Sequence, residues 1–427
     1  MLASTPPMGW NSWDCYGTTV TEDEVLANAR IMAERLLPHG WDTLVVDIAW
    51  YDPTARSHGY NAGAPLELDA HGRQMPAPHR FPSAADGAGF GPLADQVHAL
   101  GLKFGLHIMR GIPRLAVERD LPILGTEWTA AQVADLEHVC AWNPDNYGLN
   151  HDHPGAQAYY DAQVAQFAAW GVDFIKADDM QAPYYEREIA AYARAIERSG
   201  RDIALSLSPG THLSTEHVEH LRDHAQMWRI SDDLWDRWED VHAQFARLAR
   251  WAPFQQPGGW ADADMLPLGR IGIRAESGEP RHSRLTLDEQ RTLLSLWCMG
   301  RSPLMLGGDL PTSTPETLDL LSTPAIAEVL QGSTGGRELL REPLEGGELI
   351  VWKATATGSD RVYAAVFWTG EEGHDARIAL SSILGVAHGP VAATDLWPAS
   401  SPTRVDGDSL TAAVPPHGVA WVALDPA

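Results

Sequence analysis

Short apolar runs that alternate with helical patterns most strongly limit the folds open to this sequence. Eight such runs before residue 310 have the length and composition of buried strands: 7–10, 43–47, 103–108, 174–178, 203–208, 227–231, a segment near 257–266, and 303–308. Amphipathic stretches lie between them, such as 21–37, which opens with the capping-box spacing of Thr21 and Glu24. Eight strand–helix units predict an α/β protein with a (β/α)8 barrel.

The pattern changes after residue 330, where helical periods give way to short strands. These are expected at 348–354, 361–368, 391–397, 408–414 and 418–424, with turn clusters such as 357-TGSD-360 between them. The sequence therefore predicts two domains, a barrel of residues 1–330 and a C-terminal antiparallel β-sandwich of residues 331–427. The segment 331-QGSTGG-336 has the composition of a linker.

Charge and composition exclude several classes of partner. The 427 residues carry a formal net charge of −26, from 31 basic and 57 acidic side chains. That excess argues against binding to nucleic acid or to an anionic membrane surface, both of which need a basic face. No run reaches about 18 apolar residues and the N-terminus lacks the features of a signal peptide, so we expect a cytoplasmic protein outside the membrane. The three cysteines show no metal-binding spacing.

Polar side chains close most of the predicted strands. In a barrel of this kind the active site lies at the C-terminal ends of the strands. One acid there could be a structural cap, but several acids with a Lys and an Arg describe a polar funnel. The set comprises Asp47, His107, Lys176, Asp178, Asp179, Ser206, Ser208, Arg229, Asp232, Asp233, Asp262, Asp264 and Asp309.

Two of these groups indicate a chemistry. Lys176 and Asp178 are two residues apart, so they face the same side of a strand, and the Lys favours an ionised carboxylate able to act as a nucleophile. Arg229 closes another strand, and either Asp232 or Asp233 could be the carboxyl group that acts with it. Two carboxylates from different strands over one pocket are what glycoside hydrolysis requires.

Two other classes of function compete with a glycosidase. Converging Asp and His residues could hold a divalent ion, as in a metal-dependent barrel enzyme, but no HxH or HxD pair ends a strand, and Lys176 and Arg229 place positive charge there. A sugar-binding protein without catalysis would not need both carboxylates. We therefore expect an enzyme whose site is not a metal centre.

The motifs that carry these residues resemble family 27 of the glycoside hydrolases, which contains α-galactosidases and related retaining exo-glycosidases. The resemblance extends in order over nearly the whole chain, through 6-PPMGWNSWDCYG-17, 45-VVDIAW-50, 170-WGVDFIKADDM-180, 228-WRISDD-233, 258-GGWADADML-266 and 302-SPLMLGGDL-310. It implies that Asp178 is the nucleophile, that Asp233 is the acid/base, and that the enzyme needs no metal and no organic cofactor. It also implies that Trp10 forms the floor of the sugar pocket and that His107 replaces a pocket Tyr, with sugar hydroxyls bound by Asp47, Lys176, Arg229 and Asp264.

Two departures from that family are informative. The cysteines that the family commonly pairs after the third strand and after the nucleophile are absent from 106–113 and 178–180. Where α-galactosidases typically have two adjacent acids, this chain has Asp47 and Ile48, and the segment around them resembles the β-L-arabinopyranosidases of the family. Strict alternation would turn Ile48 away from the pocket, although a bulge at a barrel rim can bring both residues to the ligand.

These departures define the functional hypothesis. We expect a retaining exo-glycosidase that releases terminal β-L-arabinopyranose by double displacement, with weaker α-D-galactosidase activity; an α-galactosidase proper is the alternative. Ile48 removes a charged acceptor and adds bulk where an exocyclic hydroxymethyl group would lie. The substrate partner is a small carbohydrate glycoside. The sequence leaves open the aglycone, assembly into a homo-oligomer, and the roles of Asp179, Asp232 and Asp262.

Overall fold

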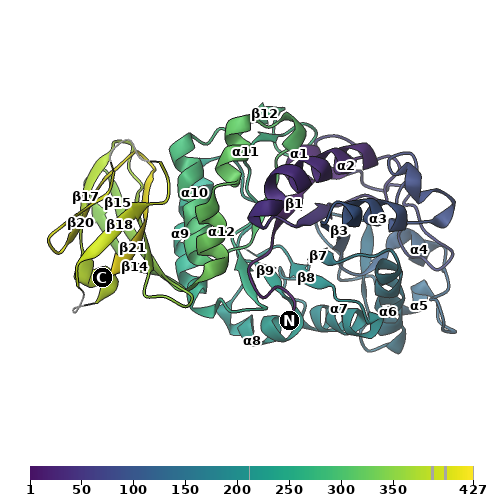
Figure 1. The fold of residues 1–427 in the computed structure, drawn as a ribbon. Helices are drawn as coiled ribbons and strands as arrows, with labels where there is room; N and C mark the ends of the chain where they lie inside the picture. The colour runs from purple at the N-terminus through teal and green to yellow at the C-terminus, as the bar shows by residue number, and fades with distance from the viewer. Residues whose placement is uncertain (211, 386–388, 399–401, 427) are drawn as a thin grey trace.

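Eight parallel strands form the first sheet of the computed structural model, which describes residues 1–427 except 211, 386–388, 399–401 and 427 (Figure 1). The sheet order β10-β9-β8-β7-β3-β2-β1-β13 follows the chain order. A parallel bridge between Leu266 and Leu306 brings the segment after β10 against β13 and closes the barrel. All eight expected strands are confirmed, as β1 Met8–Asn11, β2 Thr43–Val46, β3 Lys103–Met109, β7 Phe174–Asp178, β8 Ala204–Leu207, β9 Met227–Arg229, β10 Trp260–Asp262 and β13 Leu304–Leu306.

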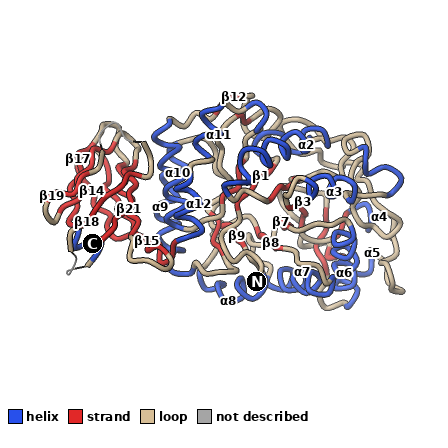
Figure 2. Tube along the Cα trace, in the orientation of Figure 1, coloured by secondary structure: helices blue, strands red, loops and turns tan. Residues whose placement is uncertain are grey.

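Helices surround this sheet (Figure 2). The capping box of Thr21 and Glu24 is present, although the α-helix that it opens ends at Ile31 and the chain continues in π and 3-10 turns to His39. The longer barrel helices are α2 Glu22–Ile31, α3 Gly91–Ala99, α6 Pro154–Ala169, α7 Glu186–Ser199, α8 Val218–His224, α9 Trp238–Trp251, α10 Leu287–Gly300, α11 Pro315–Leu321 and α12 Pro324–Gly332. In the described part of the chain, no helix is both long and apolar enough to span a bilayer.

The period of two along each strand decides what the barrel encloses. Val45, Phe174 and Met227 belong to one apolar cluster, in which they join Met305. Their neighbours Leu44, Val46 and Ile175 belong to the cluster that includes the surrounding helices. Because side chains two residues apart share a face, the same inner face continues from these apolar residues to Asp47, Lys176 and Arg229. The polar C-terminal ends of the strands therefore follow directly on the apolar cluster that fills the inside of the barrel.

The C-terminal domain is an antiparallel sandwich. Its sheets have the orders β14-β15-β16-β21-β18 and β17-β20-β19, and residues of both sheets share one apolar core. The five expected strands are confirmed, and the described residues of the domain contain three more that were not expected. The eight are β14 Ser333–Leu344, β15 Gly347–Ala356, β16 Val362–Trp368, β17 His374–Ala379, β18 Val391–Asp395, β19 Arg404–Asp406, β20 Ser409–Val414 and β21 Val419–Pro426.

The linker predicted at 331–336 is wrong. It contains the end of α12, which closes at Gly332, and the start of β14 at Ser333. We keep the domain boundary near residue 331 as a proposal, because the change from helix to strand falls there. Figure 1 shows the sandwich beside α9, α10 and α12, and the ring of Phe367 meets that of Phe245 from α9 at 5.0 Å between centroids.

Candidate active site

An open cavity of about 430 Å³ lies at the C-terminal ends of the barrel strands. Six of the nine predicted site residues line it, namely Asp47, Ile48, His107, Lys176, Asp178 and Asp233. The other lining residues are Trp13, Tyr60, Trp142, Pro209, Asp232 and Glu276. Trp10, Arg229 and Asp264 are not among the lining residues.

Asp178 is the last residue of β7, and its carboxylate is held by two neighbours. His107 Nε2 lies 3.1 Å from Oδ2, and the backbone N–H of Asp179 donates to Oδ1 at 2.9 Å. Because a carboxylate only accepts hydrogen bonds, the proton of the imidazole is on Nε2. Burial alone would raise the pKa of Asp178, but the hydrogen bond from His107 and the charges of His107 and Lys176 lower it well below its usual value. Asp178 is therefore ionised at neutral pH.

Asp47 has a complete set of partners despite being only 1 % exposed. Its Oδ2 accepts from Asn11 Nδ2 at 2.7 Å and from Lys176 Nζ at 2.9 Å, and its Oδ1 accepts from the N–H of Ile48 at 2.8 Å. Burial alone would raise the pKa of Asp47, but the charge of Lys176 and these hydrogen bonds lower it. A buried charge is tolerated here because it is both paired and hydrogen-bonded.

Ile48 lies in the cavity wall beside Asp47, although strict alternation would place it on the opposite face. The strand β2 ends at Val46 and a turn follows, in which Ala49 has a φ of +64°. This turn brings the side chain of Ile48, 2 % exposed, into an apolar cluster with Trp13 and Met109. On the side of Ile48, the cavity wall next to Asp47 is therefore hydrocarbon.

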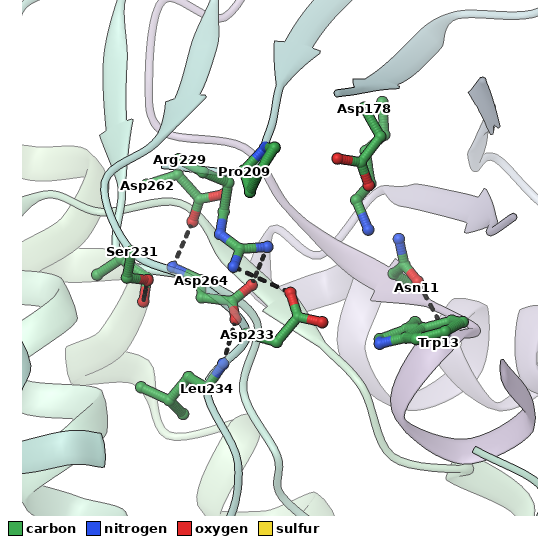
Figure 3. Close-up of polar contacts among 12 residues, drawn as sticks. Asn11, Trp13, Asp178, Pro209, Arg229, Ser231, Asp233, Leu234, Asp262 and Asp264 are labelled. Atoms are coloured by element: carbon green, nitrogen blue, oxygen red, sulfur yellow. Dashed lines mark hydrogen bonds and ion pairs between the residues drawn. The ribbon is translucent and has the colours of Figure 1, made fainter. Parts of the chain in front are cut away.

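Asp233 is supported from behind by an ion-pair network (Figure 3). Arg229 Nη2 donates to Asp233 Oδ1 at 3.2 Å, and Arg229 Nη1 lies 2.7 Å from Asp264 Oδ1. The side chain of Asp233 is 49 % exposed, whereas those of Arg229 and Asp264 are 4 % exposed. Asp233 can thus meet a ligand directly, and the other two residues hold it in place.

Two backbone contacts complete this network. Asp264, at a φ of +90°, accepts a hydrogen bond from the N–H of Leu234 at 2.6 Å, and its own N–H donates to Asp262 Oδ1 at 2.9 Å. Asp262 therefore supports the turn that carries Asp264. Asp232 lines the cavity beside Asp233, but the ion pair with Arg229 is made by Asp233, which favours Asp233 as the acid/base candidate.

Trp13 lines the cavity next to Ile48, whereas the sequence pointed to Trp10 at this place. Trp10 is completely buried and donates its indole N–H to the carbonyl of Gly308 at 2.8 Å, so it is a core residue. The backbone N–H of Trp13 donates to Asn11 Oδ1 at 2.8 Å, and the side-chain amide nitrogen of Asn11 in turn donates to Asp47. The chain leaves β1 after Asn11 and enters the short helix α1 Trp13–Tyr16, which is why the second tryptophan of the motif lines the cavity.

Asp179 lies outside the cavity, in a buried ion pair. Its Oδ2 accepts from Arg110 Nε at 3.0 Å and Nη2 at 2.8 Å, and the backbone N–H of Arg110 donates to the carbonyl of Asp178 at 3.0 Å. Asp179 has a φ of +60°, which turns the chain directly after Asp178. This pair joins the segment after β3 to the segment after β7, where the sequence lacks the paired cysteines of the resembling family. The three cysteines are free and buried.

The described residues contain no group of three or more His, Cys, Asp or Glu side chains that could hold a metal ion. Lys176 lines the cavity and is paired with Asp47, so its positive charge opposes the binding of a cation there. The arrangement instead supplies an ionised carboxylate and a second, more exposed carboxyl group in one open cavity. Acid-assisted displacement at an acetal carbon requires these two groups.

The core position of Trp10 can be tested by stability. In Trp10→Phe the carbonyl of Gly308 loses its buried donor and a void is left, so we expect the free energy of unfolding to fall by about 1–3 kcal/mol. Trp13→Phe is the matched control, because no hydrogen bond of the Trp13 indole is lost, and its effect should be below that of Trp10→Phe. Denaturant unfolding of the two variants checks this; equal stability of Trp10→Phe and wild type would contradict it.

Comparisons with known proteins identify the family of this chain. The family model described as Alpha galactosidase A matches residues 148–332. The α-galactosidase of Cyamopsis tetragonoloba is 26 % identical over 429 residues, covering 100 % of this chain and 87 % of its own. The crystal structure of a family 27 β-L-arabinopyranosidase from Geobacillus stearothermophilus is 46 % identical with a TM-score of 0.95, covering 100 % of this chain and 97 % of that one. A variant of that enzyme has been solved in complex with arabinose. Because this chain is 46 % identical to the Geobacillus stearothermophilus enzyme over its whole length, it belongs to glycoside hydrolase family 27.

Proposed function

We propose that this glycosidase is a retaining exo-enzyme that releases terminal β-L-arabinopyranose and acts more weakly on α-D-galactopyranosides. The observation that carries the proposal is the side chain of Ile48 in the cavity wall beside Asp47. The related enzyme from Geobacillus stearothermophilus, named as a β-L-arabinopyranosidase, supports the same sugar. Action in the cytoplasm stays a prediction, and assembly into a homo-oligomer stays open.

The proposed mechanism is a double displacement. The ionised Asp178 attacks the anomeric carbon while Asp233 protonates the leaving oxygen, which gives a covalent glycosyl-enzyme and the free aglycone. Asp233 then takes a proton from water, and the water oxygen displaces Asp178 with overall retention. Lys176 and His107 keep Asp178 ionised, and the ion pair with Arg229 fixes the direction of the Asp233 carboxyl group. We expect the two reacting carboxyl groups to be about 5–5.5 Å apart, as retention requires.

The choice of sugar follows from the composition of the cavity wall. Asp47 and Lys176 present a carboxylate and an ammonium group that suit ring hydroxyls. Ile48 offers no hydrogen bond to the hydroxymethyl group of galactose and occupies space near it. β-L-Arabinopyranose has the ring configuration of α-D-galactopyranose but lacks that group. A lost hydrogen bond to a charged acceptor is worth about 1.5–3 kcal/mol, or about 10- to 150-fold in kcat/KM.

The sugar preference is tested with p-nitrophenyl β-L-arabinopyranoside and p-nitrophenyl α-D-galactopyranoside. We expect wild type to show the higher kcat/KM on the arabinopyranoside. In Ile48→Asp the ratio should shift toward the galactoside by about 10-fold or more, because the new carboxylate can accept from the hydroxymethyl group. The control Ile48→Val keeps the wall apolar and should retain the preference. A wild-type preference for the galactoside would refute the proposed substrate.

The double displacement is tested by removing the nucleophile. Asp178→Ala should lose about 10³-fold or more in kcat, and azide should restore turnover by occupying the vacated position, giving an arabinopyranosyl azide of inverted configuration. Asp233→Ala is the matched variant, because its intact nucleophile should give the azide of retained configuration. NMR of the products distinguishes the two anomers. The same anomer from both variants would contradict the assigned roles.

The hydrogen bond from His107 is tested by the pH profile. Burial raises the pKa of Asp178, and the hydrogen bond from His107 lowers it. His107→Phe removes this donor, so the pKa of Asp178 should rise. Asp178 has to be ionised to attack, and activity is lost as the pH falls through its pKa. The acid limb of kcat/KM should therefore move to higher pH in His107→Phe, and less so in His107→Tyr, which keeps an O–H donor. An acid limb that does not move in His107→Phe would contradict this role.

A further inference from the structure

Three aromatic side chains form a continuous row along the cavity wall. Trp13 and Tyr60 stack with 5.8 Å between ring centroids at 18°, and Tyr60 and Trp142 follow at 5.5 Å and 47°. Exposure rises along the row, from the buried Trp13 through the partly buried Tyr60 to Trp142, which is 39 % exposed. The row therefore runs from the catalytic residues toward solvent.

The outer part of this wall is held in place by its surroundings. His58, two residues before Tyr60, bonds the loop that carries Glu276 through the carbonyls of Arg274 and Ala275, at 3.1 and 2.6 Å. That second loop is anchored by Arg281, whose guanidinium meets the buried carboxylate of Asp236 at 2.6 and 2.9 Å. Tyr60 and Glu276 thus belong to one cross-linked rim.

The segment of Trp142 is anchored as well. Its neighbour Asn143 is buried, and Asn143 Oδ1 accepts from the N–H of Asp145 at 2.9 Å. Asp145 Oδ2 in turn accepts from the hydroxyl of Tyr51 at 3.1 Å. The partly exposed indole of Trp142, on a segment that is fixed in this way, offers apolar surface that a ligand can cover.

The chemistry of this outer region fits the leaving group. The leaving oxygen has to meet Asp233, which is more exposed than Asp178, so the aglycone extends toward the cavity mouth. The same cavity is lined by the aromatic rings of Tyr60 and Trp142 and by the carboxyl groups of Asp232 and Glu276. Aromatic faces stack on the C–H face of a pyranose, and carboxylates accept from its hydroxyls. Asp232, Asp233 and Glu276 together would repel an aglycone sugar that carries a carboxylate.

We propose that Tyr60, Trp142 and Glu276 form a leaving-group subsite for a neutral pyranose, so that the natural aglycone is an uncharged sugar ring. This inference rests on the proposed exo-glycosidase function. It goes beyond it, because the residues that cut the bond do not define the aglycone.

The test compares two substrates that differ only in the aglycone. Methyl β-L-arabinopyranoside leaves the subsite empty, and a disaccharide with β-L-arabinopyranose on D-galactose fills it; p-nitrophenyl substrates are avoided because their ring also stacks. Trp142→Ala should lower kcat/KM on the disaccharide about 5- to 10-fold and change the methyl glycoside less than 2-fold. Trp142→Tyr keeps an aromatic face and should recover most of the loss.

Leu136→Ala is the matched control, because Leu136 is another exposed apolar residue that precedes Trp142 by a few positions and does not line the cavity. It should leave both substrates unchanged. Equal losses on both substrates in Trp142→Ala, or no loss on the disaccharide, would overturn the subsite.

The two proposals fail separately. The same comparison is made with methyl α-D-galactopyranoside and melibiose, an α-D-galactosyl disaccharide of glucose. A general preference for galactosides would refute the proposed sugar, while a selective loss on melibiose in Trp142→Ala would still support the subsite. Replacing the aglycone by glucuronic acid should lower kcat/KM in wild type and less so in Glu276→Gln. Equal activity of wild type on neutral and acidic aglycones would overturn the assigned charge preference.

Discussion

The ion pair between Lys176 and Asp47 is the interaction on which the rest of the site depends. Its 2.9 Å contact joins β7 to the end of β2, and Asn11 of β1 bonds the same carboxylate oxygen. Removing one partner of such a buried pair typically costs about 3–5 kcal/mol, because the other charge is left uncompensated. The pair also has a chemical role, since the charge of Lys176 helps to keep Asp178 ionised. Three strands, the nucleophile and Trp13 are thus coupled through one buried contact.

A second buried pair holds the strand of the nucleophile from outside the cavity. Arg110 and Asp179 are both nearly inaccessible, and the Arg110 guanidinium also lies over the ring of Tyr185 at 3.9 Å. Burial raises the pKa of Asp179 to about 6, with Arg110 opposing that rise. In other members of family 27 a disulfide commonly joins these two segments. Here polar contacts do so, with Arg110 reaching both the backbone of Asp178 and the side chain of Asp179.

The sequence predicted the parts of the structure that follow a regular period. The eight barrel strands and the shared face of Lys176 and Asp178 follow from alternation along a strand, and the resemblance singled out Asp233. Prediction failed where the backbone leaves regular structure. Trp10 and Trp13 are three residues apart, and only the turn after Asn11 decides which of them reaches the cavity.

The same reason explains the other differences. Tyr60, Trp142 and Glu276 come from irregular loops whose paths no local pattern records, so the outer cavity wall could not be predicted. The Gly-rich start of β14 has the composition of a linker, and composition alone does not show that it pairs in a sheet. In the structure it is paired with β15 across a register shift between Thr334 and Arg337, where Gly335 has a φ of +64°. For Ile48 the turn at Ala49, and not the strand period, sets the direction of the side chain.

The most direct test of the central claim is a crystal structure of the Asp178→Asn variant with L-arabinose bound. The account predicts that C5 of the pyranose lies within about 4 Å of the side chain of Ile48, with ring hydroxyls bonded to Asp47 and Lys176. A sugar whose C5 faces away from Ile48, or one held without contact to Asp47, would contradict it.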